Sequence, residues 1–437
     1  MSGSRRVVGV DFGTTNTVVS ALGDDGEAHL AAFAAPRGKA TAFRSALSFH
    51  GDERDPSRRV VGAGPWAIET YAEEPLETRF IQSFKTYAAS PLFQETRILG
   101  RRYEFDDLLS AYLLRLRAHG EDSLPSGATC IVGRPVNFAG QRADPDLALR
   151  RYGAAFARMG FPEIRYVFEP VAAAFFFARK LTHDATVLVG DFGGGTSDFS
   201  IVRFERQGGR LKSAALANAG VGLAGDAFDY RIIDNLVSPA LGKGSSYRAF
   251  DNVLPIPNRY YTAFARWEQL ALLRASRDMR DIRALLRTAL EPEKIGRLVE
   301  VLDLNLGYRL YQSVSALKEG LSAETHARFL FEGGDTRIER EVAREDFEAW
   351  IAPELAAISA AVDEALARAR LGADDLDRIF LTGGSSFVPA VRRLFADRFG
   401  VERVEGGGEL VSIAAGLAYI GAEPDLDVWS QRAVDVA

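Results

Sequence analysis

The chain has 437 residues, of which 47% are apolar and 26% are charged, and its formal net charge is −6. This composition is that of a folded globular protein, and it excludes a disordered chain, a collagen-like repeat and a disulfide-stapled miniprotein. The weakly acidic balance gives no electrostatic footprint for nucleic acid or for an anionic membrane surface, so we expect neither as a partner.

The ends and the cysteine content of the chain indicate an intracellular protein. Its single cysteine, Cys130, cannot form a disulfide within the chain. The first residues lack the apolar core of a signal peptide, and no stretch reaches the roughly 18 uninterrupted apolar residues of a membrane-spanning helix. We therefore expect a cytoplasmic protein.

The most informative feature of the sequence is a segment that occurs twice. Residues 7–20 read VVGVDFGTTNTVVS, and residues 187–202 read VLVGDFGGGTSDFSIV. Each copy is a β-branched run that ends in Asp-Phe-Gly, followed by a Gly/Thr turn and a second run. This pattern predicts a β-hairpin with Asp11 or Asp191 at the end of its first strand. Two copies so far apart indicate two similar lobes rather than an array of short repeats.

The two predicted turns have the chemistry of a phosphate site. A turn of Gly and Thr exposes backbone N–H groups that bind phosphate oxygens, and an Asp beside it can hold Mg²⁺ through water. One copy alone would be equally consistent with an ordinary tight hairpin. Two matched copies favour a site that grips a polyphosphate from both sides.

A third glycine segment, Gly220-Val-Gly222-Leu-Ala-Gly225, has the form G-x-G-x-x-G between a predicted strand, 214–217, and a predicted helix, 226–236. Alone, this pattern is a weak signal for dinucleotide binding. We interpret it as a further phosphate contact at a helix N-terminus. A dehydrogenase of the Rossmann type is the weakest alternative, because the stronger glycine motifs lie in hairpins.

Two kinds of helix are predicted outside these motifs. Residues 169–180 and 409–422 are rich in Ala and Gly, so their axes can approach closely and cross as a hinge between lobes, although Ala is also simply the best helix former.

Residues 260–304 predict two or three amphipathic helices, whose apolar stripes either pack into the core or form a surface for a partner. Their apolar positions are Phe264, Trp267, Leu270, Ile282, Leu285, Leu286, Ile295, Leu298 and Leu302.

These motifs, in this order, resemble the ATPase domain of the heat-shock protein 70 (DnaK-type) chaperones, within the actin-like ATPase superfamily. The first and second phosphate motifs are Gly9–Asn16 and Asp191–Asp198. The remaining matches are Glu169–Ala174 and Ser412–Gly416 for the connecting helices, Leu381–Ser386 with Pro389 for the adenosine motif, and Pro135 for a coupling proline. Gln141-Arg142 matches an arginine that is associated with this proline in the family, although the segment is one residue shorter here.

The resemblance implies an α/β, two-lobed actin-like ATPase fold, with duplicated β-sheet domains flanked by helices and an interlobe nucleotide cleft. Lobe I is expected over 1–178, with a peripheral subdomain at about 40–125 and a closing helix at 409–422. Lobe II is expected over 179–408, with a peripheral helical subdomain at about 236–335. We expect 423–437 to be a short tail with no peptide-binding domain, which resembles the truncated YegD-type homologues.

The resemblance also implies roles for single residues. Asp11 and Asp191 would orient hydrated Mg²⁺, Lys85 would reach the γ-phosphate and the attacking water, Glu169 would position that water, and Asp198 would bind a cation or act as base. The catalytic set is thus Lys85, Glu169, Asp191 and Asp198. The nucleotide-binding set is Gly13, Thr14, Thr15, Asn16, Gly193, Gly194, Gly195, Thr196, Gly222, Gly225, Asp226, Lys318, Ser322, Gly383, Gly384, Ser385 and Phe387.

Simpler interpretations exist for three of these positions. Lys85 could lie along an aromatic surface, Glu169 could be an ordinary first-turn carboxylate of a helix, and Pro135 could be a turn proline. The adenine pocket departs from the family pattern, because Ser315, Glu319 and Phe387 stand where the family has Glu, Arg and Arg. The preference for adenine is therefore less firmly implied than phosphate binding.

The expected function is that of a DnaK-like molecular chaperone ATPase domain. It would bind and slowly hydrolyse Mg-ATP, and lobe closure would engage a protein partner or client of unknown identity. The expected ligands are ATP or ADP and Mg²⁺, with a monovalent cation as a further candidate. The alternatives are a nucleotide-gated binding module or actin-like filament protein without significant turnover, and a small-molecule kinase on the same scaffold.

Overall fold

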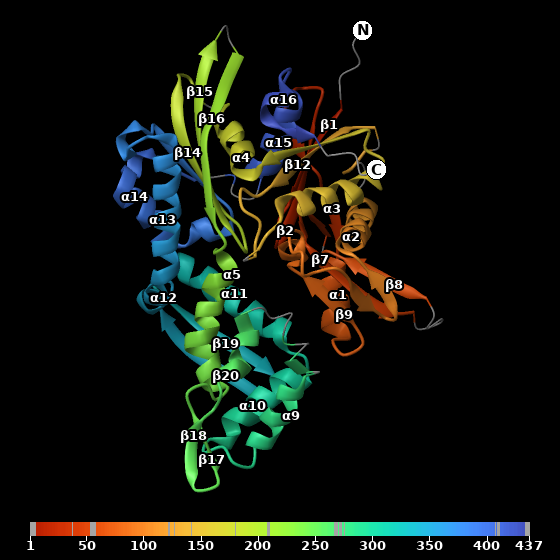
Figure 1. Cartoon of the computed structure of the whole chain (residues 1–437), viewed down its shortest axis with the longest axis vertical. Helices are drawn as coiled ribbons and strands as arrows, with labels where there is room; N and C mark the ends of the chain where they lie inside the picture. The colour runs from red at the N-terminus through yellow and green to blue at the C-terminus, as the bar shows by residue number, and fades with distance from the viewer. Residues whose placement is uncertain are drawn as a thin grey trace. The chain divides into compact units, whose positions relative to one another are not determined.

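The structure is a computed structural model. It describes residues 6–432 except 37, 53–57, 121–122, 126, 141, 180, 208–209, 266–269, 271–272, 275, 407 and 409–410. The chain divides into two compact units (Figure 1). Unit 1 comprises Met1–Ala224, Ala357–Ser386 and Val391–Ala437, and unit 2 comprises Gly225–Ala356 and Phe387–Ala390. The predicted lobe boundary at residue 178 stays a prediction.

The first large sheet of unit 1 carries the first copy of the repeat. Its strands, in spatial order, are β23 (Gln431–Arg432), β13 (Glu163–Phe168), β12 (Thr129–Arg134), β1 (Val7–Phe12), β2 (Asn16–Leu22) and β3 (Ala28–Leu30), with β6 (Ala42–Arg44) also paired to β2. Strand β1 is parallel to β12 and antiparallel to β2. Four of its six residues, VVGV, are fully buried as a run, as expected for a strand covered on both faces.

The second large sheet carries the second copy and repeats the same topology. Its order is β16 (Arg210–Val221), β15 (Ser197–Gln207), β14 (Ala185–Phe192), β21 (Arg378–Thr382) and β22 (Val404–Glu405). Strand β14 is antiparallel to β15 and parallel to β21, as β1 is to β2 and to β12. The order β13–β12–β1–β2–β3 thus recurs as β22–β21–β14–β15–β16. The predicted hairpins, the duplication and the α/β fold class are confirmed.

Smaller sheets and helices surround the first large sheet. The small sheets pair β4 (Phe33–Ala35) with β5 (Gly38–Ala40), β7 (Ala46–Gly51) with β8 (Arg59–Ala63) and β9 (Arg79–Gln82), and β10 (Thr96–Ile98) with β11 (Arg101–Tyr103). The helices are α1 (Pro65–Glu73), α2 (Phe105–His119), α3 (Pro145–Ala157) and α16 (Leu426–Trp429), with a 3₁₀ turn at Phe84–Tyr87. Helix α3 begins where the Asp144 side chain accepts the Leu147 N–H at 2.9 Å.

Two apolar helices cross in the core of unit 1. They are α4 (Glu169–Ala178) and α15 (Ser412–Gly421), which confirms the two helices expected at 169–180 and 409–422 to within a few residues. A Cβ atom on Gly416 would lie only 1.8 Å from the carbonyl oxygen of Ala172, so the backbones touch. Behind them, the Phe177 and Phe380 rings stack at 4.3 Å and join α4 to the second sheet.

Unit 2 consists mainly of helices. They are α5 (Gly225–Ile232), continued by a π-helical turn at Ile233–Val237, α6 (Ser238–Ala240), α7 (Arg259–Thr262), α9 (Arg277–Leu285), α10 (Pro292–Asp303), α11 (Gly307–Ala323) and α12 (Arg344–Trp350). Its hairpins pair β17 (Ser246–Ala249) with β18 (Asn252–Pro255), and β19 (His326–Gly333) with β20 (Thr336–Ala343). Helices α13 (Ala352–Ala369) and α14 (Pro389–Phe399) span the division between the units.

The predicted helices at 260–304 are present as α7, α9 and α10, and most of the apolar stripe is buried. Leu286 is an exception to the prediction: it follows the last residue of α9 and is 38% exposed, because the helix ends before its side chain can face the core. Trp267 lies outside the described residues. No helix among the described residues has the length and apolar character needed to cross a membrane.

Candidate functional site

The two hairpins of the repeat have the same turn. In each, the N–H of the glycine after Asp-Phe donates to the carbonyl three residues on, from Gly13 to Asn16 and from Gly193 to Thr196, both at 3.0 Å. The predicted phosphate contacts Thr14 and Thr15 lie in the first turn, and Gly194 and Gly195 in the second, with Asn16 as the first residue of β2. A side chain at Gly13 would clash with the Asn16 carbonyl at 2.4 Å, so the turn requires glycine.

The structure brings the aspartates of the two hairpins into one electrostatic cluster. Burial, with the nearby Glu169 carboxylate, raises the pKa of Asp11 to about 7, against the opposing effect of Lys85. Burial also raises the pKa of Asp191 well above its usual range, and the carboxylates of Glu169, Asp11 and Asp198 add to this rise. A buried group of neighbouring carboxylates forms a site that attracts a cation.

Lys85 and Glu169 form a buried ion pair in this cluster. The Lys85 Nζ donates to Glu169 Oε1 at 2.8 Å, with the two side chains 9% and 7% exposed. Burial lowers the pKa of Lys85, but Glu169, Tyr152 and Asp11 outweigh it and raise the pKa above its usual value. Gly133 on β12 leaves room for this carboxylate, because a Cβ there would lie 3.0 Å from Glu169 Cγ. The lysine therefore does not simply lie along an aromatic surface.

Asp198, on β15 opposite Asp191, is held by backbone N–H groups. Its Oδ1 accepts from the backbone N–H groups of Val136 at 3.1 Å and of Asn137 at 3.2 Å, which directly follow the predicted coupling proline, Pro135. Its Oδ2 is buried and has no hydrogen-bond partner by distance and angle among the described residues. Burial and Glu169 raise the pKa of Asp198 to about 7, while the Thr196 side chain opposes the rise.

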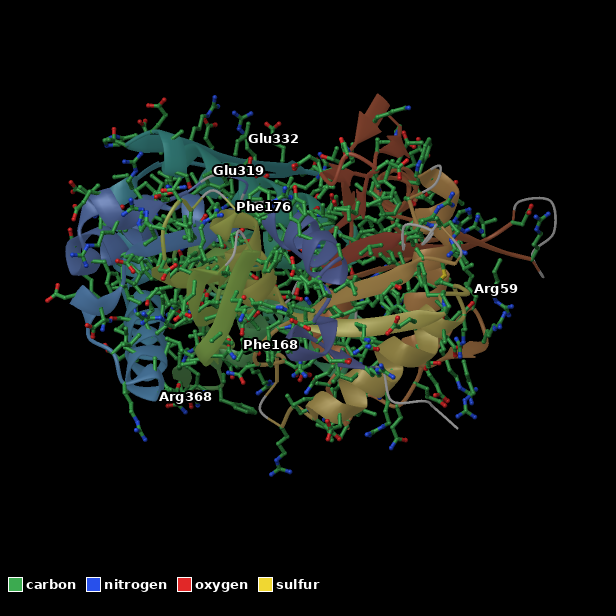
Figure 2. All side chains as sticks on the ribbon, turned by 90° about the horizontal axis from the view of Figure 1, so that it is seen from above. Arg59, Phe168, Phe176, Glu319, Glu332 and Arg368 are labelled. Carbon is green, nitrogen blue, oxygen red and sulfur yellow. The ribbon has the colours of Figure 1, made fainter. Side chains whose placement is uncertain are left out.

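Arg134 directly precedes Pro135 in the chain, and its side chain is buried. It is placed over the ring of Phe168, labelled in Figure 2, at 4.7 Å, and it donates to Gln431 Oε1 at 2.9 Å. The Arg134 guanidinium also interacts electrostatically with Glu169 and Asp198. This residue adjoins the predicted coupling proline, and no motif in the sequence predicts its contacts. The predicted partner pair, Gln141-Arg142, includes residue 141, which lies outside the described residues.

Sequence reasoning also missed the residue that fixes the first turn. Ser45 donates its backbone N–H to the Thr15 carbonyl at 2.9 Å and its hydroxyl to the Gly13 carbonyl at 2.7 Å. Its hydroxyl also lies 3.0 Å from that of Thr17. Ser45 follows the short strand β6, and a lone serine between two strands has no motif that could have identified it.

The adenosine motif supports the second turn in a similar way. Gly383 has a φ of +83°, and a Cβ on it would lie 2.2 Å from the Phe192 carbonyl oxygen, so the motif backbone packs against the end of β14. Ser385 is buried, and its hydroxyl lies 3.5 Å from the Gly193 carbonyl. Gly384 begins the 3₁₀ turn Gly384–Phe387. This part of the motif therefore adjoins the second phosphate turn.

The remaining predicted nucleotide contacts belong partly to unit 1 and partly to unit 2. Gly222 follows β16 in unit 1, and Gly225 and Asp226 form the first turn of α5 in unit 2. The α11 residue Lys318 pairs with Asp229 at 2.6 Å and lies 3.4 Å from the Gly225 carbonyl. Ser322 donates its hydroxyl to the Lys318 carbonyl, and Phe387 is 47% exposed. Glu319, labelled in Figure 2, is the next residue on α11.

The carboxylates fit a hydrated cation rather than a directly ligated one. Among the described residues, no three His, Cys, Asp or Glu side chains converge as direct ligands of a metal ion. Mg²⁺ keeps several waters and needs only one or two carboxylates together with phosphate oxygens. Burial first and neighbouring carboxylates second raise the pKa values of Asp11 and Asp191, and a bound divalent cation would favour their charged forms.

Comparison with known proteins identifies the family of the chain. The family model described as "Hsp70 protein" matches residues 93–245 and 301–423, which is more than half of the chain. The chain belongs to the Hsp70 family. Membership supports a chaperone-type ATP-binding domain for this Hsp70-family chain, in line with the expected fold and with the resemblance drawn from its motifs.

Relatives of the Hsp70-family chain include proteins named chaperone protein DnaK. That of Deinococcus deserti is 26% identical over 425 residues, which cover 94% of this chain and 59% of the relative. Those of Deinococcus radiodurans and Deinococcus proteolyticus are each 25% identical over 425 residues, covering 59% and 58% of their lengths. The chain therefore spans less than two thirds of the relatives that it matches.

Proposed function

We propose that this chain is a DnaK-like chaperone ATPase domain that binds Mg·ATP and hydrolyses it slowly. Nucleotide-dependent closure of its two lobes would engage a protein partner. The observation that carries the proposal is the cluster of Asp11, Lys85, Glu169, Asp191 and Asp198 at two equivalent Gly/Thr turns. Family membership supports the same activity.

The proposed roles follow from what the side chains can do. Phosphoryl transfer needs charge neutralisation on the phosphates and a positioned nucleophile, and the bound Mg²⁺ would supply part of that neutralisation. The backbone N–H groups of the two turns would bind the β- and γ-phosphates. Lys85 has three N–H donors, of which one serves Glu169 and the others are available for the γ-phosphate. Glu169 would orient the attacking water.

The roles of the other carboxylates differ in kind. Asp11 and Asp191 would orient the hydrated cation, each from the end of the central strand of its sheet. Asp198 has one oxygen held by backbone N–H groups, and its carboxylate also interacts with the Thr196 side chain; its second, buried oxygen would bind a monovalent cation or accept a proton. The adenosine contacts by Lys318 and Phe387 rest on the family resemblance alone.

The experiment that tests the proposal is the affinity of the full chain for Mg·ATP in Asp11→Asn combined with Asp191→Asn. We expect the double variant to lose about 100-fold in affinity, because residues that hold a metal through its outer shell contribute 10–100-fold. Its free energy of unfolding should be unchanged or higher, since the substitutions remove repulsion between buried carboxylates. Full affinity in the double variant would overturn the proposal.

The matched control is Asp374→Asn, an exposed carboxylate in a 3₁₀ turn of the same unit. It removes one negative charge, half of what the double variant removes, and should leave the affinity within twofold of the unsubstituted chain. A similar loss in this control would show that net charge, rather than the paired aspartates, governs binding.

A further inference from the structure

Arg134, the last residue of β12, is a buried cation without a carboxylate partner. Its side chain is 7% exposed, and its guanidinium donates to two neutral acceptors, Gln431 Oε1 at 2.9 Å and the Pro135 carbonyl at 3.4 Å. Among the described residues it forms no ion pair, whereas Arg165 on the neighbouring strand β13 has carboxylate partners. A buried charge is costly unless it is paired. An apolar side chain would avoid that cost, so the guanidinium itself requires an explanation.

Two phenylalanine rings enclose this guanidinium. Its Cζ lies 4.7 Å from the centroid of the Phe168 ring and 5.6 Å from that of the Phe138 ring, within the range of a cation–π contact. Phe168 pairs with Arg134 across β13 and β12 and directly precedes Glu169. Phe138 follows β12 at the end of the loop 135–138. The guanidinium therefore joins the start of α4 to this loop.

One peptide group connects Arg134 to Asp198. The Arg134 Nε donates to the Pro135 carbonyl, and the N–H of the same peptide group, which belongs to Val136, donates to Asp198 Oδ1 at 3.1 Å. A trans peptide group is planar, so its carbonyl and its N–H point in opposite directions. The cation and the carboxylate thus bind the two ends of one rigid unit. Hydrogen bonds in series also polarise and strengthen each other.

We propose that Arg134 is a positioning residue for Asp198. Its guanidinium fixes the Pro135–Val136 peptide group, so that the Val136 N–H holds Asp198 Oδ1 and the second, buried oxygen of this carboxylate stays available to a cation or a proton. The inference rests on the proposed function, in which Asp198 binds a monovalent cation or acts as base.

The test is Arg134→Met in the full chain, which keeps an unbranched side chain and removes the guanidinium. The variant should fold, because apolar side chains of similar volume commonly replace buried ions without loss of stability. We expect the rate of phosphate release in a single turnover of Mg·ATP to fall about tenfold. The Mg·ATP affinity should stay within about twofold, because the phosphate contacts lie on other residues. An unchanged rate, or a loss of affinity as large as the loss of rate, would overturn the inference.

A second variant, Arg134→Lys, separates position from charge. It keeps the positive charge, but an ammonium has no planar fork that could contact the two rings and the two acceptors together. We expect Arg134→Lys to be about as slow as Arg134→Met. Recovery of the full rate would show that the charge acts on the carboxylates through space, which would overturn the positioning role.

The matched control is Arg117→Met on α2. The Arg117 guanidinium is half-buried, donates to the Met159 carbonyl at 2.8 Å and lies 5.8 Å from the centroid of the Phe161 ring. It therefore has the same kinds of contact as Arg134, with residues outside the proposed site. The control should keep both the rate and the affinity. An equal loss of rate would contradict a specific role for Arg134.

A readout without nucleotide follows the hydrogen bonds themselves. The backbone N–H groups of Val136 and Asn137 both donate to Asp198 Oδ1, which protects them from exchange with water. In Arg134→Met, NMR should show both amides exchanging about tenfold faster, with Ile131 and Val132 in the β12 ladder unchanged. Unchanged exchange at both amides would overturn the inference. Faster exchange throughout β12 would assign Arg134 a general structural role and overturn it as well.

A double-mutant cycle separates this inference from the proposed function. In an Asp198→Asn background, Arg134→Met should have no additional effect on the rate, because the guanidinium acts through this carboxylate. A full additional effect would overturn the inference. A slow Asp198→Asn beside an unchanged Arg134→Met would also overturn it and leave the proposed function standing. An unchanged rate in Asp198→Asn would remove the proposed role of Asp198 and this inference with it.

Discussion

Burial and neighbouring carboxylates raise the pKa values of single aspartates at the site. Asp11 and Asp198 each have a pKa of about 7, and Asp191 is also raised, although Lys85 opposes the rise in all three. One ammonium paired with Glu169 does not neutralise this many carboxylates. The nucleotide-free site is therefore expected to bind protons at neutral pH that a cation would displace.

This gives a pH prediction. Because the folded pKa of Asp11 is raised from 3.8 to about 7, the folded chain binds more protons than the unfolded chain in that interval. The free energy of unfolding of the nucleotide-free protein should thus fall as pH rises from about 4 to about 7. Binding of Mg·ATP should release protons and strengthen as pH rises through about 7.

Calorimetric titration at pH 6.5 in two buffers of different ionisation enthalpy measures this proton release. Asp11→Asn should release fewer protons than the unsubstituted chain, and Asp374→Asn should release the same number. Binding without proton release, with an affinity that is flat between pH 6 and 8, would contradict the raised carboxylate pKa values.

At the scale of elements, the crossing of α4 and α15 depends on small residues. Gly416 lies against the backbone of Ala172, and Gly9 on β1 also lies close to α15, since a Cβ there would lie 2.4 Å from the Ala414 carbonyl oxygen. Helix α4 begins with Glu169, so the crossing fixes the start of the helix that carries a site carboxylate. Its role as a hinge remains a prediction.

The crossing predicts a large difference between two Gly→Ala substitutions. Gly416→Ala should lower the free energy of unfolding by about 3 kcal/mol, because the new methyl overlaps a backbone carbonyl that cannot move alone. Gly296→Ala, within α10, meets no atom within 4 Å and should gain about 0.5–1 kcal/mol from helix propensity. Urea unfolding measures both, and equal stabilities would contradict the close crossing.

At the scale of the whole molecule, what repeats in the sequence was predictable and what depends on tertiary contacts was not. The hairpins with Asp11 and Asp191 follow from residue patterns within about fifteen positions, and the duplication of topology follows from their similarity. The contacts of Ser45 with Thr17 and of Arg134 with Gln431 join segments 28 or more residues apart. Such contacts arise from packing, which leaves no local pattern in the sequence.

The central claim is that the two equivalent turns hold one magnesium-bearing triphosphate. The most direct measurement is a crystal structure of the chain with Mg²⁺ and a non-hydrolysable ATP analogue. We expect phosphate oxygens against the N–H groups of both 13–15 and 193–196, with a hydrated Mg²⁺ beside Asp11 and Asp191 and the γ-phosphate within reach of Lys85. A nucleotide that contacts only one turn, or that binds elsewhere on the chain, would contradict it.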